Sequence, residues 1–142
     1  MWFECKVRYE KLQENGGAKK VTEPYLVDAL SFTEAEARIT EEMTPYISGE
    51  FTVSAIKPTK IAEIMWDETG DRWYLTKVAF ITIDEKTAAE KRSVSQIMVQ
   101  AANFKNAVAR FEEGMKGTMA DYEIVQINET MIMDVYKMKV VQ

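Results

Sequence analysis

Aromatic and cationic residues recur at a fixed spacing in two short stretches of the chain. Trp2, Lys6 and Arg8 stand at alternate positions near the start, and Trp73 and Lys77 repeat the Trp and the Lys with the same spacing. Residues two or four apart on a β-strand point to the same face of a sheet. An aromatic ring beside cations suits a single-stranded nucleic acid, because a base stacks on the ring while a phosphate contacts the charge. These five residues are therefore candidates for nucleic-acid binding.

Two further cations, Lys20 and Arg92, occupy matching positions in the next expected strands and would add charge to the same faces. A structural alternative exists for the tryptophans. Trp2 and Trp73 would then pack in the interface between the two halves of the chain, with the lysines solvated. Aromatic side chains are more often buried than used in binding, so the sequence leaves both interpretations open.

The spacing belongs to a duplication of the whole chain. WFECKVRY returns 71 residues later as WYLTKVAF, and Phe32 returns 72 residues later as Phe104 within a longer matching block. A third block, which starts at Phe51, returns at the first offset. Chance similarity does not keep nearly one register through three blocks. We therefore predict two repeats, 1–71 and 72–142, that form one compact, pseudo-symmetric domain.

Each repeat carries the pattern of strand, strand, helix, strand and strand. In the first strand, Phe3, Cys5 and Val7 alternate with polar residues, which is typical of a sheet with one buried face. Ser31 precedes the first expected helix as a capping residue, and Asn103 precedes the second. The prediction is an α+β fold with pseudo-twofold symmetry, made of two ββαββ units whose antiparallel sheets are each covered by one helix. The strands expected after the helices are 50–57, 60–66, 121–127 and 130–139.

A second arrangement uses the same elements. Four strands in succession, starting at Phe51, would form an antiparallel meander that packs on the helix at 104–115. The two ends of the chain would then complete the other unit. The order of elements in the sequence is compatible with both arrangements.

Composition limits the classes of function. The chain has 142 residues, no His, one Cys and a net charge of −5. Without His, neither Ser-His-Asp catalysis nor a His-based metal site can form, and no glycine-rich phosphate loop is present, so we expect no enzyme, no cofactor and no metal. The negative net charge disfavours coating of duplex DNA. Because a long apolar run and a signal-peptide pattern are both lacking, we expect a cytoplasmic protein without membrane association.

Two features that resemble reactive or metal-binding sites have simpler structural explanations. The run Asp67–Asp71 contains part of a calcium-loop pattern but lacks the alternating ligands and the distal Glu, so we interpret it as a tight turn. Cys5 lies on the apolar stripe of the first strand, so we expect a buried and unreactive thiol.

Two resemblances extend these interpretations. The stretch VTEPYLVDALSFTEAEARI, which follows WFECKVRYEK, resembles a full-length family of uncharacterised proteins from gut Bacteroidetes and their phages and mobile elements. That resemblance implies a context but no site. The architecture of four strands and one helix, present twice, is similar to that of the Whirly and PUR-repeat proteins. The likeness implies single-stranded nucleic-acid binding by sheet aromatics and basic residues.

The functional hypothesis from the sequence is therefore non-catalytic binding of single-stranded DNA or RNA. The alternative is a protein-interaction module that forms a homo-oligomer through its sheet edges or helix faces. The hypothetical nucleic-acid-binding set comprises Trp2, Lys6, Arg8, Lys20, Trp73, Lys77 and Arg92.

Overall fold

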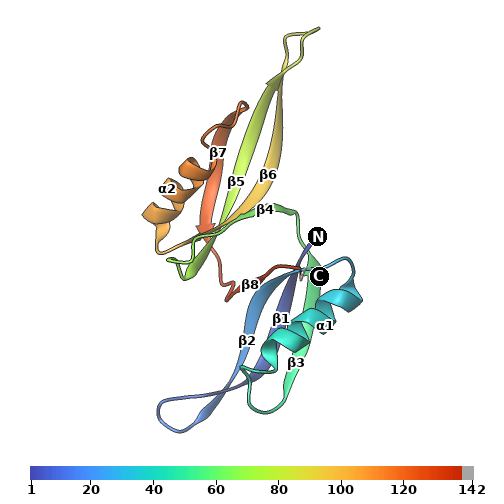
Figure 1. The fold of residues 1–142 in the computed structure, drawn as a ribbon, viewed down its shortest axis with the longest axis vertical. Coiled ribbons are helices and arrows are strands. Elements are labelled where there is room, and N and C mark those ends of the chain that lie inside the picture. The colour runs from blue at the N-terminus through green and yellow to red at the C-terminus, as the bar shows by residue number, and fades with distance from the viewer. Residues whose placement is uncertain (139–142) are drawn as a thin grey trace. The chain divides into compact units, whose positions relative to one another are not determined.

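The computed structural model describes residues 1–138 of the chain, which divides into two compact units. Unit 1 contains Met1–Thr59 together with the segment that starts at Met131, and unit 2 contains Lys60–Thr130. Each unit has one four-stranded sheet and one helix (Figure 1). The predicted α+β fold with a duplicated unit is confirmed.

Unit 1 has three long antiparallel strands and one short strand that pairs in parallel. The strand order in its sheet is β3-β1-β2-β8, and β8 runs parallel to β2. Its elements are β1 (Trp2–Leu12), β2 (Ala18–Asp28), α1 (Phe32–Met43), β3 (Phe51–Pro58) and β8 (Val135–Tyr136).

Unit 2 repeats this arrangement. The strand order in its sheet is β4-β6-β5-β7, and β4 runs parallel to β6 while the other neighbours are antiparallel. Its elements are β4 (Ile61–Met65), β5 (Arg72–Ile83), β6 (Glu90–Ala101), α2 (Phe104–Gly114) and β7 (Asp121–Glu129).

The last strand of each repeat belongs to the sheet of the other repeat. β4 comes from the first repeat and pairs with β6, whereas β8 comes from the second repeat and pairs with β2. The continuous meander from Phe51 is therefore wrong, because β3 pairs with β1 and not with β4. The sheets are also not wholly antiparallel. A parallel neighbour needs a crossover connection. Between β2 and β8 the chain passes through unit 2, whereas β4 and β6 are connected through β5 within unit 2.

The expected strand at 130–139 is much shorter than predicted. Within the described residues only Val135–Tyr136 is a strand, and residue 139 lies outside them.

Two equivalent threonines fix the main chain at the two points where it passes from one unit to the other. Thr59 is the last residue before unit 2, and its N–H and Oγ1 both donate to the carbonyl oxygen of Trp2, at 2.9 and 2.8 Å. Thr130, the equivalent residue of the second repeat, donates in the same way to the carbonyl of Trp73, at 2.8 and 2.9 Å. The repeated Trp positions therefore have a main-chain role in the fold.

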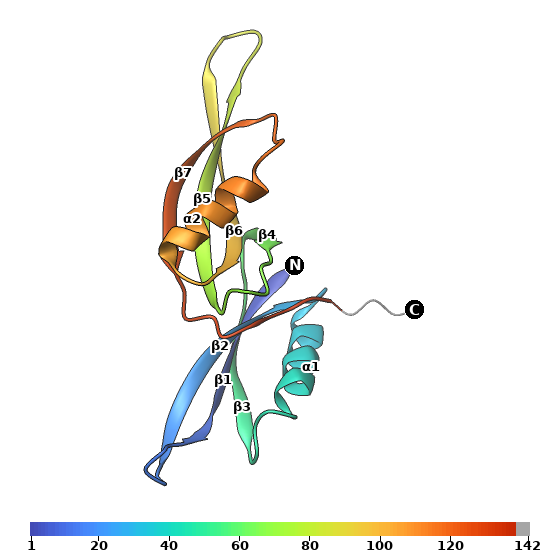
Figure 2. The ribbon, with the colours of Figure 1, turned by 60° about the vertical axis from the view of Figure 1, so that its left-hand side comes forward.

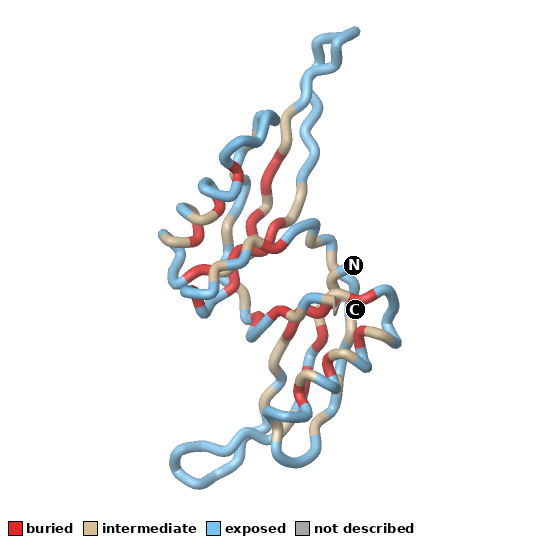
Figure 3. The backbone as a smooth tube through the Cα atoms, in the orientation of Figure 1, coloured by how far each residue is buried: buried red, intermediate tan, exposed pale blue. Residues whose placement is uncertain are grey.

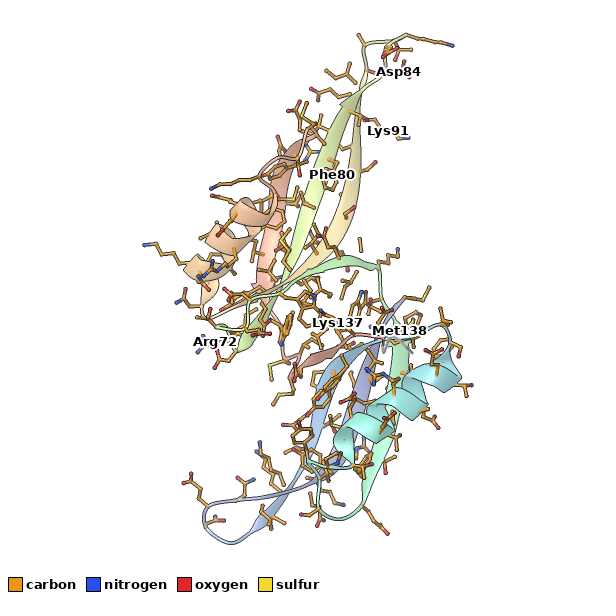
Figure 4. All side chains as sticks on the ribbon, viewed as in Figure 1. Arg72, Phe80, Asp84, Lys91, Lys137 and Met138 are labelled. Atoms are coloured by element: carbon orange, nitrogen blue, oxygen red, sulfur yellow. The ribbon has the colours of Figure 1, made fainter. Side chains whose placement is uncertain are left out.

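Each exchanged strand is held by an arginine from the helix of the unit it joins. Arg38 of α1 donates to the carbonyl oxygen of Lys137, just after β8 (Figure 4). Arg110, the equivalent residue of α2, forms an ion pair with Asp67, shortly after β4. The helix of each unit thus fixes the chain at the end of the incoming strand.

The core of unit 1 lies between its sheet and α1. Phe3, Cys5 and Val7 of β1 face Ala35 and Ile39 of α1, and all five are buried (Figure 3). Burial, aided by the charge of neighbouring Glu4, raises the pKa of the Cys5 thiol to about 11. The prediction of a buried cysteine is confirmed, and the raised pKa keeps the thiol protonated and unreactive near neutral pH.

The core of unit 2 is built in the same way, with Val78, Val99 and Phe111 at its centre. Both helices begin at the predicted caps. Ser31 Oγ accepts from the main-chain N–H three residues later at 3.1 Å, and Asn103 Oδ1 does the same at 2.8 Å. Each helix covers one face of its own sheet and leaves the other face without a helix (Figure 2). We call this second face the outer face of each unit.

Candidate nucleic-acid interface

The outer face of unit 1 carries cations in largely neutral surroundings. Antiparallel pairing places Lys6 of β1 opposite Pro24 of β2 and Ala55 of β3. Arg8 lies opposite a threonine on each side, at positions 22 and 52. Lys6 and Arg8 are both exposed. Their charges therefore lie on an open surface formed mainly by small uncharged side chains.

Four cations follow a diagonal across this face. Lys57 of β3 lies opposite Glu4, and Lys20 of β2 lies opposite Glu10. With a rise of about 3.4 Å per residue and about 4.8 Å between strands, consecutive cations have main-chain positions about 7–8 Å apart. We call this set the basic diagonal, and in order it consists of Lys57, Lys6, Arg8 and Lys20.

The basic diagonal keeps its charges available. All four side chains are exposed, and within residues 1–138 none of them forms an ion pair with a carboxylate. Glu4 and Glu10 lie on the same face, beside the two ends of the diagonal. Four cations against Glu4, Glu10 and Asp28, of which Asp28 is paired with the N-terminal ammonium, leave this face locally positive, although the whole chain carries a net charge of −5.

The two repeated tryptophans differ in exposure. Trp2 is half-buried, opposite Asp28 at the end of the outer face near Lys57. Trp73 is only 2% exposed, and its ring meets that of Trp66 edge to face, with centroids 5.6 Å apart. A base needs an accessible ring face for stacking, and in this structure Trp73 offers none.

The outer face of unit 2 has two of the four corresponding cations, Lys77 and Arg92. Lys77 remains and is half-buried between Gln96 and Gln126. Ala79 stands where the first repeat has Arg8, and Asn128 stands where it has Lys57. The repeats therefore share a backbone arrangement but differ in surface chemistry.

Arg92 is paired within its own sheet. Its Nη1 lies 2.9 Å from Glu123 Oε2 of β7, so the ion pair spans the intervening strand β5. The register places Ala79 opposite Glu123, and Ala79 is fully buried. A small residue here leaves room for the ion pair above β5. Because the negative charge of Glu123 offsets that of Arg92, the ion pair weakens the attraction of Arg92 for an incoming phosphate.

The structure thus divides the seven predicted residues into two sets. The residues Trp2, Lys6, Arg8 and Lys20 lie on the outer face of unit 1, and Trp73, Lys77 and Arg92 lie on that of unit 2. Lys57 was missed by sequence reasoning. Its alternation with Ile56 places it on an outward position, but only the β1–β3 register reveals its neighbours.

The acidic run at Asp67–Asp71 forms the predicted turn. Asp67 Oδ1 accepts from the Thr69 N–H at 3.1 Å and from the Thr69 hydroxyl at 2.6 Å, and the Gly70 N–H donates to the Asp67 carbonyl at 2.9 Å. These Thr69 bonds, with the charge of Arg110, hold the pKa of Asp67 below its usual value. In the part of the chain that the structure describes, no group of three or more acidic or Cys side chains is placed to hold a metal ion.

Among the described residues, no helix is long and apolar enough to cross a bilayer.

The fold and the two outer faces define a duplicated α+β protein with a positively charged sheet surface in one unit. The chain belongs to the family described as Domain of unknown function (DUF4494), whose model matches residues 1–138. No curated protein and no solved structure matches the chain.

Proposed function

We propose that this chain binds single-stranded nucleic acid on the outer face of unit 1, without catalysing a reaction. The basic diagonal is the observation that carries the proposal. Its cations are exposed, unpaired among the described residues, and spaced comparably to successive phosphates of an extended strand. Trp2, at the Lys57 end, would contact a base with the exposed part of its ring.

An open sheet face favours a single strand over a duplex. The four cations lie on one open sheet face and follow one line, which suits one flexible backbone. The net charge of −5 would repel the many phosphates of a duplex beyond the diagonal. Single-strand binding therefore needs only the local positive charge of unit 1.

The number of phosphate contacts predicts the salt dependence of binding. For single strands, log K falls with log[salt] at a slope of about −0.7 per phosphate contact. Four contacts by the basic diagonal give a slope of about −2.8. Removal of one cation should reduce the slope to about −2.1 and weaken binding to every sequence alike.

Fluorescence anisotropy with labelled oligo-dT and oligo-rU, measured over a series of salt concentrations, tests the proposal. Lys6→Gln is the test variant, and Lys77→Gln is its matched control at the same position of the second repeat. We expect Lys6→Gln to lower both the affinity and the slope, and Lys77→Gln to leave both unchanged. The proposal fails if the native protein does not bind at low salt, or if the two variants behave alike.

The setting of this function is part of the proposal. Similarity to Whirly and PUR-repeat proteins is consistent with strand binding on a sheet. A resemblance to proteins of gut Bacteroidetes and their phages and mobile elements suggests a role in replication or element maintenance, in the cytoplasm.

A second candidate is a protein-interaction module that forms a homo-oligomer. The outer face of unit 2 exposes Ile83 and Val94, at 64% and 62%, and Val94 stands where the first repeat has Thr22. Exposed apolar side chains favour association. Light scattering would then show an oligomer that Val94→Lys dissociates, and a monomer at all concentrations would contradict this candidate.

A further inference from the structure

A groove lies at one end of unit 1, next to the basic diagonal. Its volume is about 1040 Å³, and it is lined by the β1–β2 hairpin and the α1–β3 connection. Figure 1 shows this hairpin and this connection at the same end of unit 1. Arg8 and Lys20, two members of the diagonal, also line the groove. A strand bound along the diagonal would therefore reach the groove without leaving the protein surface.

The groove exists because β1 is longer than β3. The β1–β3 ladder ends where Tyr9 pairs with Phe51, but β1 continues to Leu12. Among the described strands none pairs with this extension on the β3 side, so the main-chain edge of residues 10–12 faces the groove. Such an edge offers hydrogen-bonding groups to a polar ligand.

The opposite wall presents an aromatic ring on an ordered connection. Tyr46 lines the groove and is 78% exposed. The N–H groups of Tyr46 and Ile47 both donate to the Met43 carbonyl at 3.0 Å, and Ile47 packs against the core. Gly49 then turns the chain into β3 with a φ of +101°, a conformation that favours glycine. The main chain that carries Tyr46 is thus held in place, and the ring is exposed.

The groove combines cationic side chains with an aromatic ring, although two carboxylates also line it. Arg8, Lys11 and Lys20 line it, against the carboxylates of Glu10 and Glu50. Lys11 is itself 3.8 Å from Glu23, so Arg8 and Lys20 carry the available positive charge. Arg8 and Lys20 suit contact with a phosphate, and the exposed ring of Tyr46 suits stacking on a base. The free main-chain edge suits hydrogen bonds with the polar edge of that base.

We propose that this groove is a base-binding subsite, in which a nucleobase of the bound strand stacks on Tyr46 while Arg8 and Lys20 contact its flanking phosphates. This inference rests on the proposed function and adds a requirement to it. The basic diagonal alone would bind a backbone regardless of its bases. The groove makes the ligand a strand that carries bases, with at least one base unstacked from its neighbours.

The test compares two labelled oligomers of equal length, oligo-dT and a wholly abasic deoxyribose-phosphate strand. Tyr46→Ala should weaken binding of oligo-dT by roughly tenfold, the effect typical of a lost base–aromatic stack. The same variant should bind the abasic strand as the native protein does. Tyr46→Phe, which keeps the ring, should retain oligo-dT binding. Met119→Ala in the equivalent connection of unit 2, where the side chain is 99% exposed, is the control and should change neither affinity.

The outcomes separate this inference from the proposed function. If native protein binds both strands but Tyr46→Ala changes neither affinity, the subsite is overturned and backbone binding stands. Equal weakening of both strands would also overturn base stacking, because the abasic strand has no ring to lose. If native protein binds neither strand at low salt, the proposed function itself fails.

Discussion

The two repeated tryptophans should contribute unequally to stability, and substitution of each by alanine measures the difference. Trp73 is 2% exposed and in edge-to-face contact with Trp66, whereas Trp2 is half-buried. Replacing a fully buried Trp by Ala removes its apolar contacts and leaves a cavity, which costs about 3–5 kcal/mol. Replacing Trp2 by Ala should cost about 1–2 kcal/mol, because part of the Trp2 ring is already in solvent. A total stability of about 5–15 kcal/mol makes the loss at Trp73 large.

Urea unfolding followed by far-UV circular dichroism is the suitable assay, because removing a tryptophan changes the fluorescence signal itself. The hydrogen bonds from Thr59 and Thr130 go to main-chain carbonyls, so neither substitution removes them. The difference therefore reports side-chain burial. Equal losses for the two variants, or a larger loss for Trp2→Ala, would refute the unequal roles assigned to the two tryptophans.

Two more predictions concern the turn before β5. A Cβ on Gly70 would lie 2.5 Å from the main-chain carbon of Ala101, so Gly70→Ala should lower the free energy of unfolding by about 1–3 kcal/mol. Gly17→Ala, which meets only the Asn15 side chain at 3.2 Å, is the control, and equal urea midpoints for the two variants would contradict the prediction. The pKa of Asp67 is lower in the folded state, so its stabilising effect is present above the unfolded pKa and is lost as the pH falls through the folded pKa. Asp67→Asn should therefore lose less stability than the native protein between neutral pH and about pH 3, and an equal loss in urea midpoint would count against this assignment.

The duplication and both helices could be predicted from the sequence because they rest on local patterns. Ser31 and Asn103 precede helices whose apolar residues recur at helical spacing, and both act as caps. The exchange of β4 and β8 agrees with the second arrangement, in which the two ends of the chain complete one unit, but the sequence did not decide between the two arrangements. Strands of five and two residues carry too little alternation to indicate a partner, and nothing local distinguishes a hairpin from passage into the other unit.

The candidate site was predictable only in part for a related reason. Alternation in β1 indicates correctly that Lys6 and Arg8 face away from the core. The ion pair of Arg92 with Glu123 depends on which strands flank β5, and that information is not local. Recognition of Lys57 as a neighbour of Lys6 likewise needs the β1–β3 register, which a bulge shifts between Lys6 and Val7.

The exchanged strands also set an order for folding during synthesis. Unit 2 is contiguous from Lys60 to Thr130, so its whole sheet can assemble once that stretch has left the ribosome. Unit 1 must wait for Val135, which pairs with Leu26 more than one hundred residues earlier. Until then the edge of β2 stays open, and an open edge is a site for mispairing with another chain. The nascent chain is therefore most vulnerable to aggregation in the unit that is translated first.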